Sequence, residues 1–179
     1  MKYIEHKDNH TYVHLENKTI CCKVVPETFV KELCLARLFS YEGMRQAVKL
    51  KLNIKTNIPI YVTYDLILIP TGSPRQKETI WINYAKIKDY RMLNYHTRVT
   101  FTDDSVVTIN FSIKSLNKKF IECEKIINHL KTEKMSVYNM WLITFSSINI
   151  WQKSPNSDII TTINTIINLL EELYGKEND

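Results

Sequence analysis

A stripe of apolar side chains runs through the third quarter of the chain. Its members lie alternately three and four positions apart, which places them on one face of an α-helix. They are Ile113, Leu116, Phe120, Cys123, Ile127 and Leu130. Ser112 is a suitable N-cap for this helix, which we predict to reach about Lys131. A second helix is predicted over residues 158–174, with Gly175 at its end.

Shorter segments before residue 112 favour strands. Asn17-Lys18 and Asp103-Asp104-Ser105 each separate two β-favouring runs, which predicts two hairpins. The runs beside these turns cover residues 11–15, 19–25, 98–102 and 106–111. Further strands are predicted over residues 58–63, 66–69, 80–82 and 87–93, with Pro59 marking an edge or a start. Pro26 opens a predicted helix that extends to about Phe39.

Residues 48–55 give the clearest strand pattern. Apolar side chains alternate there with polar ones, so one face suits a core and the other carries three ammonium groups. The alternating pairs are Val48-Lys49, Leu50-Lys51, Leu52-Asn53 and Ile54-Lys55. The predicted strands come first along the chain and the two strong helices come late. This order predicts an α+β fold rather than repeated βαβ units. We expect a mainly antiparallel β-sheet with flanking helices and two C-terminal helices.

Charge is unevenly distributed along the chain. The net charge is +5, but residues 158–179 hold five acids and one base, so the remaining residues carry +9. A basic body with an acidic tail favours a polyanionic partner, and no basic amphipathic helix indicates a lipid surface. No apolar run is long enough to span a bilayer, and the amino terminus lacks an apolar signal core. We therefore expect a cytoplasmic protein without a membrane partner.

The patterns of common catalytic and metal sites do not occur. The three glycines, Gly43, Gly72 and Gly175, cannot form a phosphate-binding loop, and neither a nucleophile elbow nor an HExxH motif is present. Four cysteines and five histidines lack the paired spacing of a zinc site. We expect thiols packed as small apolar groups, no metal and no cofactor. Nothing singles out a pairing such as Cys34 with His96, and no enzyme activity is predicted.

Several short motifs follow one another between about residues 33 and 130. The first contains Cys34, then Ser40-Tyr41-Glu42-Gly43, and then Arg45. The later ones are Ile58-Pro59-Ile60, Leu68-Ile69-Pro70-Thr71, Ser73, Arg75-Gln76, Ile80-Trp81-Ile82, residues 99–105 and Ser115-Leu116. In order and spacing this set resembles the ComK family, the competence transcription factors of Gram-positive bacteria. Met44 stands where that family usually has a second base.

The resemblance implies a transcription activator of competence (DNA-uptake) genes. Such a protein binds paired A·T-rich boxes of double-stranded promoter DNA as a multimer, mainly through the minor groove. Lysine and arginine suit phosphates and the narrow, negative minor groove of A-tracts. The candidate DNA-binding residues are Arg45, Lys49, Lys51, Lys55, Arg75, Gln76 and Lys77. Of these, Arg45, Arg75 and Gln76 match positions that the family retains.

Each candidate also has a structural alternative. For Arg45 and Arg75 it is a salt bridge that braces a loop, or a solvated side chain. For the lysines of residues 48–55 it is the water-facing side of an edge strand. Gly43 is expected to supply a positive φ that supports the basic loop.

Five further residues are assigned a structural role first. Lys114, Lys118 and Lys119 are predicted to form a solvated helix face, with DNA contact as the alternative. Tyr41 and Trp81 are predicted to be core or loop-anchoring aromatic residues, with a wedge between bases as the alternative.

Two parts of the chain are expected. Residues 1–135 form a ComK-like, β-rich DNA-binding core, and residues 136–179 form a divergent segment that ends in an acidic-tailed helix packed on the core. In ComK proteins the carboxyl-terminal part helps oligomerisation and capture by the MecA–ClpC machinery. The resemblance thus implies a homo-oligomer, with an adaptor and a protease of that type as further candidate partners.

Two other functions stay open. One is a degenerate ComK paralogue that binds regulatory proteins and little DNA, which the loss of a base at Met44 favours. The other is a small-molecule enzyme, for which no site chemistry converges in the sequence.

Overall fold

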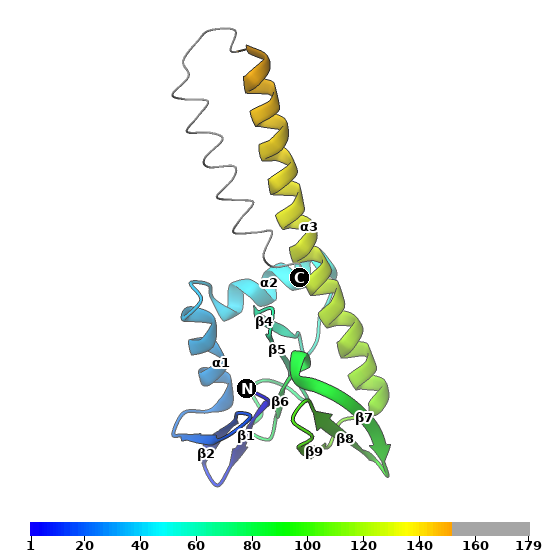
Figure 1. Cartoon of the computed structure of the whole chain (residues 1–179). Helices are drawn as coiled ribbons and strands as arrows, with labels where there is room; N and C mark the ends of the chain where they lie inside the picture. Colours follow the sequence, from blue (N-terminus) through cyan, green and yellow to red (C-terminus); the bar gives the residue numbers. More distant parts are fainter. Residues whose placement is uncertain (152–179) are drawn as a thin grey trace. The chain divides into compact units, whose positions relative to one another are not determined.

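The computed structural model describes the backbone of residues 1–151 and the side chains of residues 1–132 (Figure 1). It divides the chain into a unit over Met1–Thr132 and a second unit over Glu133–Asp179. The first unit contains all strands of the described residues and every candidate DNA-binding residue. The helix predicted over residues 158–174 lies outside the described residues.

A six-stranded antiparallel sheet forms the centre of the first unit. Its strand order is β3-β2-β1-β6-β5-β4. The strands are β1 (Tyr3–Lys7), β2 (His10–His14), β3 (Thr19–Cys22), β4 (Ile60–Thr63), β5 (Leu66–Pro70) and β6 (Trp81–Asn83). Pro59 directly precedes β4, which is an edge strand, as predicted. The sequence reasoning missed β1, whose only buried apolar side chain is Ile4.

A second, three-stranded sheet and a long helix follow. The short 3₁₀-helix η1 (Tyr84–Lys86) leads into β7 (Ile87–Leu93), β8 (His96–Phe101) and β9 (Val106–Ile109), which pair antiparallel in the order β7-β8-β9. The predicted turn at residues 103–105 joins β8 to β9, with Asp104 in the left-handed region. Helix α3 (Ile113–Trp151) starts where its cap predicts, because the N–H of Ser115 donates to Ser112 Oγ. Its predicted end near Lys131 is wrong, because the helix continues to Trp151 through residues without a regular apolar stripe. The α+β class is thus confirmed.

The predicted strand over residues 48–55 is wrong. Residues Tyr41–Leu52 form helix α2, and Asn53 ends it with a φ of 55°. The inward face of α2 is made by Tyr41, Met44, Val48 and Leu52, at helical spacing, whereas Leu50 is 72% exposed. Alternation arose because Val48 and Leu52 share a helix face and Ile54 is buried in the loop that follows. The lysines of this segment therefore do not share a strand face.

Helix α1 (Pro26–Leu35) starts at Pro26 as predicted but ends before Phe39. The chain turns there through Leu38, which has a φ of 63° and is almost fully exposed. The predicted hairpin through Asn17-Lys18 is confirmed as β2 paired with β3.

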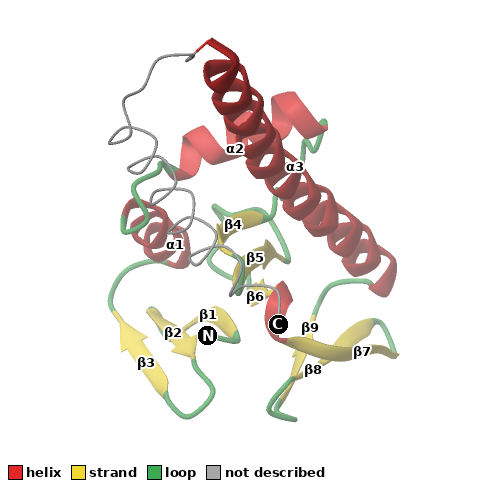
Figure 2. Cartoon of the chain, turned by 45° about the horizontal axis from the view of Figure 1, so that its top comes forward, coloured by secondary structure: helices red, strands yellow, loops and turns green. Residues whose placement is uncertain are grey.

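Both faces of the central sheet are covered. On one face, side chains such as Ile4, Leu68 and Trp81 pack against Val30 and Cys34 of α1. On the other face, Ile67, Ile69 and Ile82 pack with apolar side chains of β8, β9 and the first turns of α3. Figure 2 shows α1 and α3 on opposite sides of β4, β5 and β6. Because the sheet is fixed from both sides, the segments that leave its ends are held in defined places.

Candidate nucleic-acid interface

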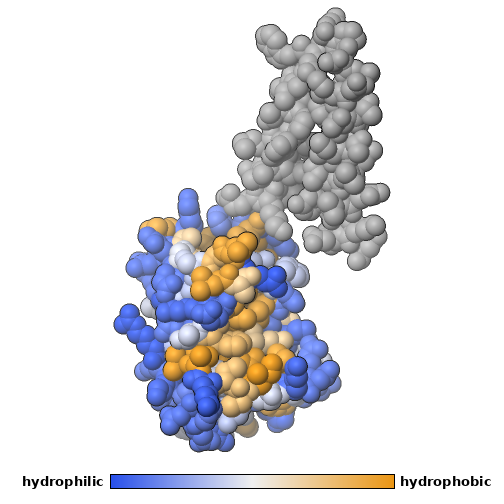
Figure 3. Space-filling view, turned by 90° about the vertical axis from the view of Figure 1, so that its left-hand side faces the viewer, coloured by the Kyte–Doolittle hydropathy of each residue, from blue (hydrophilic) through white to orange (hydrophobic). Residues whose placement is uncertain are grey.

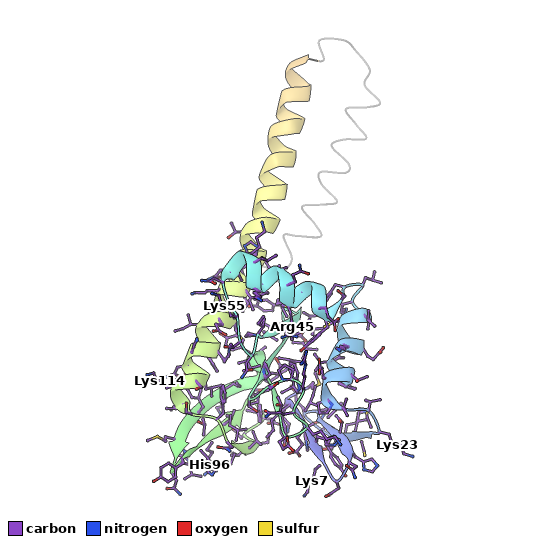
Figure 4. All side chains as sticks on the ribbon, turned by 180° about the vertical axis from the view of Figure 1, so that it is seen from behind. Lys7, Lys23, Arg45, Lys55, His96 and Lys114 are labelled. Atoms are coloured by element: carbon purple, nitrogen blue, oxygen red, sulfur yellow. The ribbon has the colours of Figure 1, made fainter. Side chains whose placement is uncertain are left out.

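The stretch from residue 43 to residue 64 contains four bases and no acid. The bases are Arg45, Lys49, Lys51 and Lys55. The three lysines are exposed, and Arg45 is half-buried. None of the four forms an ion pair within the described residues, whereas Lys31, on α1, pairs with two glutamates. Figure 4 labels Arg45 and Lys55 beside α2. The lack of acids over residues 43–64 is a sequence signal for a basic surface. The prediction of a strand over residues 48–55 did not use it.

The aromatic ring of Tyr41 supports Arg45 from one helical turn away. The guanidinium carbon of Arg45 lies 5.3 Å from the ring centroid, within the range of a cation–π contact. Tyr41 is buried and meets Trp81 edge-on, with 6.4 Å between ring centroids. The Nε of Arg45 has no hydrogen-bond partner among the described residues. Arg45 is therefore ordered by a ring and not by the salt bridge considered from the sequence.

The acid closest in sequence to Arg45 is engaged by another base. Lys31 Nζ lies 3.2 Å from Glu42 and 3.4 Å from Glu27. A backbone hydrogen bond and the hydrogen bond from Lys31 lower the pKa of Glu42. Glu42 thus stays ionised and ties α2 to α1, and it forms no ion pair with Arg45.

Ser40 and Gly43 explain the spacing of the Ser-Tyr-Glu-Gly motif. The N–H of Gly43 donates to Ser40 Oγ at 3.0 Å, which caps α2. A Cβ at position 43 would lie 2.7 Å from that oxygen. The φ of Gly43 is not positive, so the expected role of this glycine is wrong. It leaves room for the cap that starts the helix.

The loop between β5 and β6 presents the other candidates. Arg75, Gln76 and Lys77 are exposed at its tip. The loop is braced from within, because the N–H of Gln76 donates to the Ser73 carbonyl at 2.9 Å and the hydroxyl of buried Thr79 donates to the same carbonyl. Neither Arg75 nor Lys77 pairs with an acid in the described part of the chain. Salt bridges therefore do not account for this loop either.

Sheet register places the loop and the start of β4 at one end of the sheet. Strands β4 and β5 are antiparallel, with Ile60 opposite Leu68. The start of β4 thus lies beside the end of β5, from which the loop leaves, whereas Lys55 lies five positions before β4 and beside α2 (Figure 4). The turn between β2 and β3, which carries Lys18, lies at the opposite end.

Lys119 has a different role from the predicted one. It is only 5% exposed, and its Nζ donates to the Thr56 carbonyl at 2.7 Å and to Glu122 at 2.5 Å. The prediction of a solvated helix face is wrong for this residue, while Lys114 and Lys118 are exposed. Because Thr56 follows Lys55, the Lys119 contact fixes the segment that presents Lys55.

Tyr41 and Trp81 are core residues, as predicted, and neither can act as a wedge between bases. They are 1% and 0% exposed. Cys34 and Cys123 are also buried, and burial raises the pKa of the Cys34 thiol to about 11, so it stays protonated. Cys21 is exposed, against the expectation of four buried thiols.

The described residues give no support to a Cys–His catalytic pair or to a metal site. Buried Cys34 and exposed His96 belong to different parts of the first unit, α1 and the start of β8. A depression at the end of the sheet opposite the basic loop is lined by Glu16, Asp65 and Lys86. Lys86 lies 2.7 Å from Glu16, so these charges compensate each other. No group of three His, Cys, Asp or Glu side chains in the described part could hold a metal ion, and no described helix is both long and apolar enough to cross a membrane.

The comparisons with known proteins give one match. The family model described as ComK protein matches residues 1–135, about three quarters of the chain. Neither the curated proteins nor the solved structures gave a match.

Proposed function

The chain belongs to the ComK family of competence transcription regulators, and we propose that it activates competence genes by binding double-stranded A·T-rich promoter DNA. ComK is a transcription factor family and not an enzyme family. In this proposal the protein acts in the cytoplasm, at the nucleoid, as a homo-oligomer. It contacts paired A·T-rich boxes mainly through the minor groove.

One observation carries the proposal: the bases between residues 45 and 55 and those of the β5–β6 loop form no ion pair within the described residues. Lys49, Lys51 and Lys55 are exposed on and just after α2, and Arg75 and Lys77 are exposed on the loop. Each phosphate that such a cation neutralises releases condensed counterions, which favours binding at low salt. Phosphate contacts position a protein on DNA, and side chains such as Gln76 can reach base edges beside them.

The base missing at position 44 does not weaken this proposal. Met44 is half-buried and packs both against the cluster under α1 and against the cluster of Val48, Ile54 and Ile58. Its side chain thus contributes to the packing of α2, and the exposed cations of α2 are present without it.

A second candidate function is binding of regulatory proteins, such as a MecA-type adaptor of the ClpC protease. Large apolar side chains are exposed on β3, on the loop after it and at the end of α1. They are Ile20, Val24, Val25, Leu35 and Leu38. Figure 3 shows a band of apolar side chains on this side of the molecule. Exposed apolar patches of this kind are typical of protein contact surfaces, and self-association would cover them equally.

The DNA proposal is tested by binding of the purified full chain to a duplex with two phased A·T-rich boxes, against a G·C-rich duplex, at two salt concentrations. We expect A·T-selective binding that weakens with salt. Arg75→Ala and Lys51→Ala should each weaken it and lower the slope of log affinity against log salt by about 1. Lys18→Ala is the matched control, since Lys18 is equally exposed but lies at the opposite end of the sheet. Equal binding to both duplexes would contradict the proposal and favour the protein-binding alternative.

A further inference from the structure

The hairpin of β7 and β8 ends in a surface that the fold itself does not use. Its strands stay in register to Leu93 opposite His96. A two-residue turn, Asn94-Tyr95, closes it, and Asn94 adopts the left-handed φ of 55° that such a turn requires. We call residues 91–98 the arm. Figure 4 labels His96 at its free end, at the edge of the molecule.

Two arginines face each other on the arm. Arg91 and Arg98 are direct cross-strand partners, so their side chains project from the same face of the sheet. Like charges in this position destabilise a strand pair unless something neutralises them. Neither arginine forms an ion pair with a described residue, and Asp89 of the same strand is paired with neither. The arm therefore carries two uncompensated guanidinium groups side by side.

The tip of the arm is apolar and exposed. Met92 is 68% exposed, Leu93 45% and Tyr95 94%. Leu93 flanks the turn, Tyr95 lies within it, and Met92 lies one pair further back, opposite Thr97. Exposed apolar side chains that lie close together are typical of contact surfaces, so the tip suits a partner.

The inner side of the hairpin holds the arm firmly. Tyr90 packs against Phe120 of α3 with 4.9 Å between ring centroids, and its hydroxyl donates to Asn117 at 2.6 Å. The hydroxyl of buried Thr97 donates to the Phe111 carbonyl at 2.5 Å. The arm is thus presented on a rigid support, as a binding element requires.

We propose that the arm enters the minor groove of duplex DNA, with Arg91 and Arg98 at the phosphates and Leu93 and Tyr95 against a base step. This inference rests on the proposed DNA-binding function and assigns it a second contact. The paired positive charges suit a polyanion better than a protein surface of mixed charge. Arginine is favoured in a narrow, negative minor groove. Apolar side chains that enter this groove partly unstack a base step and bend the duplex.

The test combines affinity with DNA bending, followed by energy transfer between dyes at the two ends of an A·T-rich duplex. Arg91→Gln/Arg98→Gln should lower the salt slope by about 2, because two phosphate contacts are lost. Leu93→Ser/Tyr95→Ser should keep the salt slope and reduce the bend. Both variants alter exposed positions at the end of a hairpin, and unchanged thermal unfolding confirms that they fold. Lys18→Gln serves as the control for the loss of a distant charge.

The outcomes separate this inference from the proposed function. If both arm variants bind and bend the duplex like the unaltered protein while Arg75→Ala binds weakly, the arm inference is wrong and the proposed function stands. If the tip variant changes only the oligomeric state, the arm is a contact between copies of the chain and the inference is also wrong. If the unaltered protein binds no duplex, both are wrong.

Discussion

Arg45 is restricted before any partner arrives. Its guanidinium lies over the ring of Tyr41, and Tyr41 is fixed by burial against Trp81. A long side chain that is already ordered loses less conformational entropy on meeting a phosphate than a free lysine does. Glu42 is held by Lys31 and forms no ion pair with Arg45. At the scale of single residues, the basic surface of α2 depends on which side chains are charged and also on which acids are held by other bases.

Lys119 and Glu122 form a buried ion pair under the segment that presents Lys55. We predict that Lys119→Met lowers the free energy of unfolding by about 3 kcal/mol, because it leaves the Glu122 carboxylate buried without its partner. Lys119→Met/Glu122→Leu should recover most of that loss, since neither charge then remains. Denaturant unfolding of the two variants measures this. A single variant as stable as the unaltered protein would show that the pair is solvated.

The candidate residues could be predicted from the sequence, but their pairing could not. Lysines look alike in a sequence, yet Lys31 and Lys119 are paired to acids while Lys49, Lys51 and Lys55 are not. Pairing depends on contacts such as the one between Lys119 and Thr56, sixty-three positions apart. The absence of acids between residues 43 and 64 was the available signal.

At the scale of elements, helix and strand patterns compete over residues 41–54. The cap by Ser40 and the left-handed Asn53 define a helix of three turns, whereas the alternation of apolar residues favours a strand. The pairing of β8 with β9 was predicted correctly because polar turn residues separate the two strands. The start of α3 was predicted correctly because its apolar stripe is long and regular and fits only a helix. When a short segment fits both the helix period and the strand period, its own sequence does not decide between helix and strand.

Substitutions in α2 separate the two structures. Leu50→Glu should change the free energy of unfolding by less than about 0.5 kcal/mol, because Leu50 is exposed on the helix. Val48→Ala should cost about 2 kcal/mol, since Val48 is buried against Ile126 of α3. In a strand both side chains would face the core. Thermal or denaturant unfolding gives the comparison, and a large loss of stability in Leu50→Glu would contradict the helix.

At the scale of the whole molecule, the central sheet separates distinct surfaces in the first unit. Antiparallel pairing places the β5–β6 loop and the segment before β4 at one end of it. The turn with Lys18 lies at the other end. The exposed apolar side chains of β3 and α1 form another surface, which is free for contacts between copies of the chain or with a regulatory protein. Sequence order gave the fold class, but only strand order brings these segments together.

Hydrogen exchange of the full chain, with and without an A·T-rich duplex at low salt, tests the location of the DNA surface most directly. We predict that exchange slows in the loop of residues 71–79 and in the segment of residues 53–57, because bound DNA shields their exposed amides. The turn between β2 and β3 should exchange as before. Slowed exchange confined to β3 and α1, or no change anywhere, would show that DNA does not bind at these two segments.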